Sequence, residues 1–383
     1  MYMWLFISYL TIVLTALYCL LIILYTFFFN KLVLFKRNAG LQPQTLFSIV
    51  IPARNEAGNI EKCLLSVLKN EYPKDLFEII VVDDFSTDET AGIVLQLQKQ
   101  FTNLKLIQLK DHISSKQNSY KKKSIETAVS FAVYEWIVTT DADCEVKNSW
   151  LQMLDAYIQE KAPVFIAAPV KFTNTGSFIA VFQCLDFISL QGITAASVSA
   201  GMLSMCNGAN LAYRKDAFYA VDGFKGVDNI ASGDDMLLMH KIKKQFPRKA
   251  AYLFSKDVIV STPPMPDWKS FINQRIRWAS KATSYDDKKI SLVLLLVYFV
   301  NLFLLLLPFL SIFYTPLFCL WVILLTCKIL FETIFMLPVS TFFSERKLIL
   351  WFPVMQPFHI LYTVVSGWLG KFGTYEWKGR NVK

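Results

Sequence analysis

The sequence predicts an α/β domain with a doubly wound sheet, flanked in the chain by membrane-spanning helices. The central residues 46–265 alternate short apolar runs with amphipathic stretches of about ten residues, the pattern of strands followed by helices. Polar and charged residues gather directly after several of these apolar runs. Both ends of the chain carry long stretches without a charged side chain, which indicates helices that cross a bilayer.

The first 30 residues contain no charged side chain and are long enough to span a bilayer as one helix. They lack both a basic start and a small-residue cleavage site, so we expect an uncleaved anchor at residues 1–30 rather than a signal peptide. The juxtamembrane linker, residues 31–45, carries Lys31, Lys36 and Arg37. The positive-inside tendency then places the central domain in the cytoplasm.

The central domain, residues 46–265, reads as a regular series of strands and helices. Strands are expected at residues 46–51, 79–82, 104–109 and 136–139. Helices are expected at residues 60–70, 89–101 and 124–134. Such alternation predicts a parallel sheet, and ligands of parallel sheets bind beyond the carboxyl ends of the strands.

The polar residues after the first two strands are candidates for ligand contacts. Arg54 and Glu56 follow the first strand, and Asp84 is the second of two successive aspartates after the second strand. Part of these loops has a simpler explanation, because Asn59 and Thr87 are suited to cap the two following helices. Asp84 precedes the capping positions and is not needed for that purpose.

The fourth strand is followed by Asp141-Ala142-Asp143. Two carboxylates one residue apart at a strand end can hold a hard divalent cation such as Mg²⁺ or Mn²⁺, with Asp143 as the direct ligand. A run of three lysines, Lys121 to Lys123, precedes the third helix. Lysines gain nothing from the dipole at a helix start, whereas a diphosphate there satisfies both them and the amide donors. We take Lys122 as the contact, although the sequence does not decide among the three.

Two further segments lie later in the central domain. Asn207 and Gly208 precede a strand, and Gly208 permits close approach of the backbone to a ligand. Gly233-Asp234-Asp235 opens a helix, where an acid also serves as a simple cap.

An amphipathic helix is expected at residues 266–289. Gln274, Arg277 and Trp278 are spaced i, i+3 and i+4 and therefore share one face. The opposite side carries Trp268, Ile272, Ile276 and Ala279. This pattern predicts an interfacial helix whose apolar side meets the membrane or the domain, with the polar triad turned inward.

A membrane region follows at residues 290–370. The uncharged residues 290–327 are too long for one span and contain Pro316 near the middle. We expect a hairpin of helices at residues 290–313 and 317–337. Lys328 and Glu332 lie four residues apart on the second helix, which favours a structural ion pair that faces protein rather than lipid.

The third apolar stretch, residues 348–370, is interrupted by Pro353 and Pro357. It either spans or re-enters the membrane, and the sequence leaves both open. A full span conflicts with the charge rule, because it places the basic tail, residues 371–383, outside.

Composition excludes several other classes of protein. The net charge of +9 is concentrated beside apolar segments, so anionic lipid headgroups and a diphosphate explain it without nucleic acid. The seven cysteines form no C-x-x-C pair and indicate free thiols in a reducing compartment. No P-loop, H-E-x-x-H motif or nucleophile elbow is present.

Gln274-Arg275-Ile276-Arg277-Trp278 follows the D-x-D and G-D-D segments in an order that resembles one enzyme group. The chain resembles the processive and lipid-linked family 2 glycosyltransferases, the type that includes cellulose and hyaluronan synthases. The resemblance covers about residues 47–278 plus the flanking helices, and it implies a GT-A fold. Two departures are that no glycine precedes the lysines and that Asp234 stands where glutamate is usual.

The resemblance also implies roles for individual residues. Asp235 is the expected general base and Asp143 the metal ligand. The expected donor contacts are Arg54, Glu56, Asp84, Lys122, Asp141 and Arg277. The expected acceptor pocket contains Asn207, Gly208, Gln274 and Trp278.

These roles imply an inverting transferase that moves a sugar from a nucleoside diphosphate, with UDP favoured, to a membrane-associated lipid or glycan. A processive polysaccharide synthase and a non-catalytic nucleotide-sugar-binding membrane component remain alternatives. A nucleotidyltransferase is a further rival, but the Q-x-x-R-W segment has no purpose in that chemistry. We expect an integral protein of the cell (inner) membrane.

Overall fold

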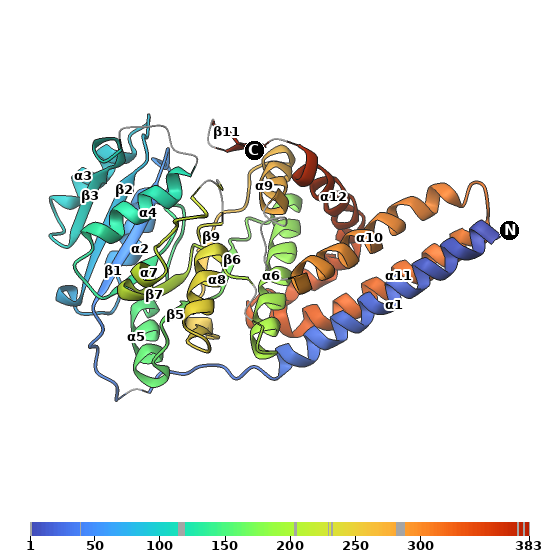
Figure 1. Ribbon diagram of the computed structural model, residues 1–383, viewed down its shortest axis with the longest axis horizontal. Helices are drawn as coiled ribbons and strands as arrows, with labels where there is room; N and C mark the ends of the chain where they lie inside the picture. Colours follow the sequence, from blue (N-terminus) through green and yellow to red (C-terminus); the bar gives the residue numbers. More distant parts are fainter. Residues whose placement is uncertain are drawn as a thin grey trace. The chain divides into compact units, whose positions relative to one another are not determined.

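The computed structural model describes residues 2–38, 40–113, 119–202, 205–228, 230, 233–280, 288–373, 375–377 and 380–382. The chain divides into two compact units, and each is described by itself (Figure 1). The sheet unit comprises Val33–Thr173 and Gly201–Pro263. The helical unit comprises Met1–Leu32, Asn174–Ala200 and Pro264–Lys383.

The sheet unit is built on a mixed sheet which, within the described residues, has seven strands in the order β3-β2-β1-β4-β7-β5-β8. The strands are β1 (Phe47–Ala53), β2 (Phe77–Asp83), β3 (Leu104–Gln108), β4 (Trp136–Thr139), β5 (Phe165–Ala167), β7 (Leu211–Arg214) and β8 (Ala250–Tyr252). A smaller parallel pair joins β6 (Val170–Phe172) to β9 (Val260–Thr262). Strands β1 to β4 pair in parallel, so their carboxyl ends lie on one edge of the sheet.

The four strands predicted from the sequence pair in parallel as expected, but the sheet as a whole is mixed. Strand β7 runs antiparallel to both β4 and β5. A four-residue strand with buried Leu211, Ala212 and Tyr213 carries no signal of direction, because the same side chains fit either ladder. The reversal starts β7 beside the carboxyl end of β4, with Leu211 paired to Thr139, and so brings the 207–210 turn to that edge.

The helices of the sheet unit are α2 (Ile60–Leu68), α3 (Thr90–Gln98), α4 (Tyr120–Phe131), α5 (Trp150–Lys161), α7 (Lys215–Ala220) and α8 (Met236–Gln245). Helix α4 packs on β1 and β2, and α3 packs on β2 and β3. Strand β2 is buried along its whole length, as is β1 except at Pro52. Helix α4 begins four residues earlier than expected, so the three lysines belong to its first turn.

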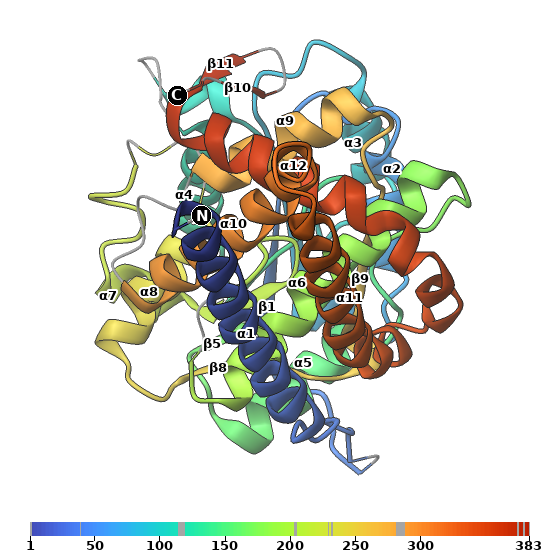
Figure 2. The same cartoon turned by 90° about the vertical axis from the view of Figure 1, so that its right-hand side faces the viewer.

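The helical unit contains α1 (Tyr2–Asn30), α6 (Phe178–Ser199), α9 (Trp268–Ala279), α10 (Lys288–Leu310), α11 (Pro316–Phe342) and α12 (Phe352–Phe372). The short strands β10 (Tyr375–Trp377) and β11 (Arg380–Val382) follow α12. Helix α1 packs against α6, α10 and α11, and α9 packs against α12 (Figure 2).

Among the described residues, five helices are long and apolar enough to cross a membrane: α1, α6, α10, α11 and the segment that ends with α12. Helix α6 was not expected, and it belongs to the helical unit although its sequence lies inside the predicted central domain. The third C-terminal stretch forms one continuous helix despite its prolines. Pro353 lies in the first turn of α12, where its missing N–H is not needed.

Close helix packing in the helical unit depends on glycines. A Cβ atom added to Gly192 of α6 would lie 2.6 Å from a methyl group of Val339 on α11. A Cβ atom at Gly370 of α12 would lie 2.7 Å from the Cβ of Ala279 on α9. Small residues at such crossings let helix backbones approach one another in membrane proteins.

Lys328 and Glu332 form the ion pair expected from their spacing, with a Nζ–Oε1 distance of 2.7 Å. Both side chains are buried within the helical unit, so the prediction that the pair faces protein rather than lipid is confirmed.

Candidate active site

The loops that follow β1 and β2 are held together by hydrogen bonds at the carboxyl edge of the sheet. Arg54 Nη1 donates to the backbone oxygens of Asp84 and Phe85, at 2.7 and 3.1 Å. The amide of Thr87 donates to Asn55 Oδ1 at 2.8 Å. Asp84 is buried beneath this contact. Two predicted donor contacts, Arg54 and Asp84, are therefore brought together on one rigid edge.

The predicted cap of α2 is wrong. Asn59 makes no side-chain cap, and its amide nitrogen instead donates to Glu56 Oε2 at 2.9 Å. The backbone N–H of Glu56 donates to Thr90 Oγ1 at 2.8 Å. Asn59 thus orients the Glu56 carboxylate within the loop after β1.

The start of α3 also differs from the prediction. Asp88, not Thr87, accepts a bond from the Thr90 amide, at 3.1 Å, and it also accepts one from the Ala57 amide at 3.0 Å. Burial by itself would raise the pKa of Asp88, but the hydrogen bonds from Thr90 and Ala57 lower it. The ionised carboxylate therefore ties the start of α3 to the loop after β1.

The D-x-D acids follow β4 at the same edge. Ligand atoms of Asp141, Asp143 and Cys144 lie within 4.8 Å of one another. Burial, followed by the charges of Asp143 and Asp141, raises the pKa of the Cys144 thiol well above its usual value. Cys144 therefore stays a protonated thiol, and the two carboxylates are the donors that fit a hard cation. Sequence reasoning did not assign Cys144 to this cluster.

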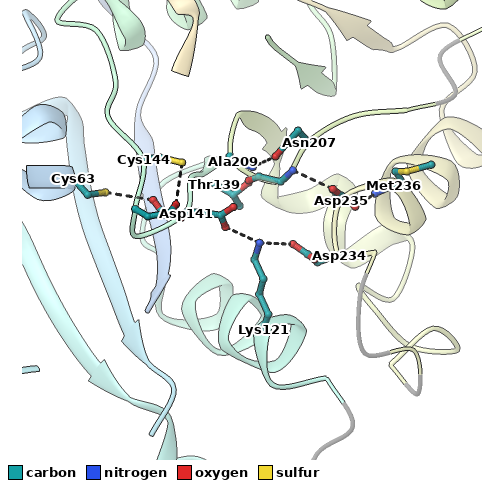
Figure 3. A network of polar contacts seen from close by, with 12 residues as sticks. Cys63, Lys121, Thr139, Asp141, Cys144, Asn207, Ala209, Asp234, Asp235 and Met236 are labelled. Atoms are coloured by element: carbon teal, nitrogen blue, oxygen red, sulfur yellow. Dashed lines mark hydrogen bonds and ion pairs between the residues drawn. The ribbon is translucent and has the colours of Figure 1, made fainter. Parts of the chain in front are cut away.

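Lys121 lies at the centre of the acidic cluster (Figure 3). Its Nζ lies 2.6 Å from Asp141 Oδ1 and 3.1 Å from Asp234 Oδ2. Burial would lower the pKa of Lys121, but the charges of Asp141 and Asp234 raise it well above its usual value. Lys121 therefore remains a cation at any physiological pH and links α4 to the two acidic segments.

The choice of Lys122 as the donor contact is not supported by its position. Lys122 is 1% exposed and its Nζ donates to the backbone oxygens of Val227 and Ile230, at 2.6 and 2.7 Å. These bonds give Lys122 a structural task, tying α4 to a distant loop. Adjacent residues of a helix point about 100° apart, so only one of the two lysines can face the acids.

Asp235 lies at the other side of the cluster (Figure 3). The Gly208 N–H donates to Asp235 Oδ2 at 3.2 Å, and the Met236 N–H donates to Oδ1 at 2.7 Å. Asp235 is therefore the N-cap of α8, as the simpler interpretation held, but it also orients the turn that carries the predicted acceptor residues. A Cβ atom at Gly208 would lie 3.0 Å from Asp234 Oδ2, which explains the glycine.

The Asn207 side chain stabilises that turn, because its Oδ1 accepts a bond from the Ala209 amide at 3.0 Å. Thr139 Oγ1, at the end of β4, donates to the backbone oxygen of Gly208 at 2.9 Å. Asp235, Gly208 and the D-x-D acids are thus parts of one connected network within the sheet unit.

The Q-x-x-R-W residues lie on α9 in the helical unit. The Trp278 ring packs against Phe187 of α6, with ring centroids 5.8 Å apart, and the Arg275 guanidinium lies over it at 4.2 Å. Ile276, which was predicted to lie on the apolar side of this helix, is buried within the unit, as expected for a side that meets protein. Sequence reasoning missed Arg275, whose side chain is buried against Asp186 at 2.7 Å.

Two family models match the chain. The model described as "Glycosyl transferase family 2" matches residues 48–221, and the model described as "Glycosyl transferase family group 2" matches residues 136–369. The chain belongs to the family 2 glycosyltransferases. The predicted enzyme class is therefore confirmed, and the apolar helices mark it as a membrane protein.

Curated relatives agree with this assignment. Glycosyltransferase AglE of Haloferax volcanii is 28% identical over 219 residues, which cover 57% of this chain and 67% of that protein. A poly-beta-1,6-N-acetyl-D-glucosamine synthase of Staphylococcus epidermidis is 25% identical over 285 residues, 70% of this chain. The match spans 64% of the length of that synthase.

Among solved structures, the mannosyltransferase PcManGT from Pyrobaculum calidifontis, in complex with GDP-Man and Mn²⁺, is similar to this chain. Its TM-score is 0.56 at 17% identity, and the match covers 94% of this chain and 99% of that one. The likeness confirms the predicted GT-A fold with flanking helices.

Proposed function

We propose that this glycosyltransferase moves a sugar from a nucleoside-diphosphate donor, a UDP-sugar, to a membrane-associated lipid or glycan acceptor with inversion at the anomeric carbon. One observation carries the proposal: Lys121, Asp141, Asp143, Asp234 and Asp235 meet at the carboxyl edge of the sheet, where ligands of such sheets bind. The Lys121 cation lies among carboxylates beside a potential metal site, and together with a bound metal ion it would offset the charge of a diphosphate.

The donor binds along this edge. Asp84, below the Arg54 contact, takes the uracil ring, with Arg54 and Glu56 beside it. Asp141 and Asp143 would hold Mg²⁺ or Mn²⁺, because ionised oxygen donors suit hard cations. When bound, such a cation would supply Lewis-acid charge neutralisation for the departing diphosphate. The Lys121 ammonium adds a second positive charge at the phosphates.

Asp235 is the general base in this proposal. It accepts the proton of the acceptor hydroxyl as that oxygen attacks the anomeric carbon, and the nucleoside diphosphate departs from the opposite side. Hydrogen bonds from the Gly208 and Met236 amides fix the carboxylate before the acceptor arrives. Asp234 cannot serve as freely, because its carboxylate contacts Lys121 at 3.1 Å.

The acceptor is held at the membrane. We assign Gln274 and Trp278 of the helical unit to the acceptor sugar and Arg277 to the diphosphate, the roles that the family resemblance implies. Asn207 and Gly208 of the sheet unit are assigned to the sugar pocket on the same ground. The helical unit lies in the cell (inner) membrane, with the sheet unit in the cytoplasm. Trp4, near the start of α1, stacks on Tyr314 of the α10–α11 turn, with ring centroids 5.7 Å apart. These aromatic residues mark one membrane interface. Lys31, which follows the opposite end of α1, marks the cytoplasmic interface.

The test incubates membranes that contain the protein with a panel of radiolabelled UDP- and GDP-sugars and either Mg²⁺ or Mn²⁺. We expect label from one UDP-sugar in a lipid or glycan fraction, lost in Asp143→Ala and in Asp235→Asn. Labelled product from the Asp235→Asn variant at the wild-type rate would refute the role of the base. Release of sugar without any glycosylated product would refute transfer to a membrane acceptor.

A processive polysaccharide synthase is the second candidate, favoured by the similarity to the S. epidermidis synthase and by the five candidate spans. The size of the product distinguishes the two. A single transfer gives one discrete labelled species, whereas a processive enzyme gives long polymers even when most acceptors remain unused.

A further inference from the structure

A cluster of buried polar side chains crosses the helical unit and has no assigned task. It contains Asp186 of α6, Arg275 of α9, Lys328 and Glu332 of α11, and Gln356, His359 and Tyr362 of α12. Ionisable residues among membrane helices are costly and usually serve a function. The lysine and the arginine of the cluster each pair with one acid, in the ion pairs Asp186–Arg275 and Lys328–Glu332.

The two pairs differ in which helices they join. Gln356 Nε2 donates to Glu332 and its Oε1 accepts from Lys328, at 2.7 and 2.6 Å, which ties α12 to α11. Tyr18 of α1 also donates to Glu332. Neither partner of this pair contacts α9 through any of these bonds.

The Asp186–Arg275 pair, in contrast, fixes α9. Arg275 Nη2 lies 2.7 Å from Asp186 Oδ2, and Tyr362 of α12 donates to the other oxygen of Asp186. The guanidinium lies over the rings of Phe271 and Trp278, at 4.8 and 4.2 Å from their centroids. Its nitrogens make no aligned hydrogen bond among the described residues, so charge attraction and ring contacts hold it.

The contact between Arg275 and Asp186 is relevant to the site because Arg275 lies inside the Q-x-x-R-W segment. Residues two apart on a helix point about 200° apart, so Arg275 and Arg277 face nearly opposite ways. Arg277 remains partly exposed, whereas Arg275 is 3% exposed. The pair with Asp186 therefore sets the rotation of α9, and with it the direction of Arg277.

We propose that Arg275 and Asp186 are positioning residues for the transfer reaction: their buried ion pair locks the rotation of α9 on α6 and α12 and so sets the direction of Gln274, Arg277 and Trp278, the residues assigned to the diphosphate and the acceptor. This inference rests on the proposed function of those three residues. A misplacement of about 1 Å at a reacting group can lower a rate about a hundredfold.

The test compares two matched neutral double variants in purified, detergent-solubilised protein. Asp186→Asn with Arg275→Met removes the positioning pair, and Lys328→Met with Glu332→Gln removes an equally buried pair that does not hold α9. Removing both charges together avoids an unpaired buried charge, so both variants are expected to fold. The kcat is expressed per folded molecule, and the donor KM and the melting temperature are measured beside it.

We expect the first variant to lose at least about tenfold in kcat and to show a raised donor KM, because the pair sets the direction of Arg277, which is assigned to the diphosphate. The second variant should keep its kcat within about twofold of the wild type. Arg275→Lys should recover part of the loss, since it retains the charge opposite Asp186 but not the flat contact with the rings.

Equal kcat losses in the two double variants, or a loss that disappears once folded protein is counted, would show that Arg275 is only structural. A failure of the proposed function is recognised separately, because Asp235→Asn in the wild-type background would then remain active. If Asp235→Asn is inactive while the Asp186→Asn, Arg275→Met double variant is unimpaired, the proposed function stands and only the positioning role is refuted.

Discussion

Replacing each of three consecutive lysines on α4 by methionine should have three different consequences. Lys121→Met removes the ammonium that lies 2.6 Å from Asp141 and 3.1 Å from Asp234, and leaves these carboxylates close together. Lys122→Met removes two bonds to backbone oxygens in the interior. Lys123→Met removes a half-buried contact to Glu126 at 3.4 Å and is the matched control.

The expected magnitudes follow from these contacts. A hydrogen bond to a charged group contributes about 1.5–3 kcal/mol, and the Lys121, Asp141 and Asp234 side chains are 23%, 34% and 12% exposed. Solvent screening favours the lower end, so the free energy of unfolding of Lys121→Met should fall by about 1–2 kcal/mol. Loss of a preorganised cation at the departing diphosphate should lower kcat by about 10²–10³.

Lys122→Met should reduce stability by about 2–4 kcal/mol, because two buried carbonyls lose a charged donor, while kcat per folded molecule stays near the wild type. Lys123→Met should change stability by less than about 0.5 kcal/mol and leave kcat unchanged. Thermal melting with a UDP-release assay measures both quantities. The reasoning is refuted if Lys122→Met abolishes turnover per folded molecule while Lys121→Met turns over like Lys123→Met.

Three further predictions follow from the metal site and the glycines. Mn²⁺ and UDP together should raise the melting temperature of the wild type, and Asp143→Ala or chelation with EDTA should abolish this rise. An undiminished rise in the variant would contradict Asp143 as the metal ligand. Gly233→Ala should lower stability by about 1–2 kcal/mol, because Gly233 has a φ of +82°, and it should reduce kcat by displacing the acids that follow; normal values of both would show that the turn adapts freely. Gly192→Ala should lower the melting temperature in detergent, because its Cβ would meet Val339 at 2.6 Å and such overpacking costs about 1–3 kcal/mol. The control Gly58→Ala, whose Cβ would have nothing within 4 Å, should not lower it. Equal melting temperatures of the two variants would argue against tight helix packing at Gly192.

Much of the site was accessible from the sequence because strands, loops and charges are local features. The acids after β2 and β4 were expected at strand ends, and the register of the parallel strands places them on one edge. The choice among three adjacent lysines was not accessible. It depends on the rotation of α4 against the sheet: the lysines lie in the first turn of this helix, with Lys121 directed to the acids and Lys122 into the interior.

Longer-range relations were also missed. The apolar character of α6 is plain in the sequence, but its membership of the helical unit follows from packing against α1 and α11. The role of Arg275 was not predicted, because its partner Asp186 lies 89 residues earlier in the chain.

The sequence by itself determined the alternation of strands and helices, the uncharged spans, the order of the acidic motifs and hence the family. These features depend on hydrophobic periodicity and on residues close in the chain, so they can be inferred without knowledge of the tertiary structure. Only the tertiary structure decided the direction of β7, the lysine that faces the acids and the partner of Arg275. Each depends on how one element is rotated or reversed against another, and that is fixed by packing between residues far apart in the chain.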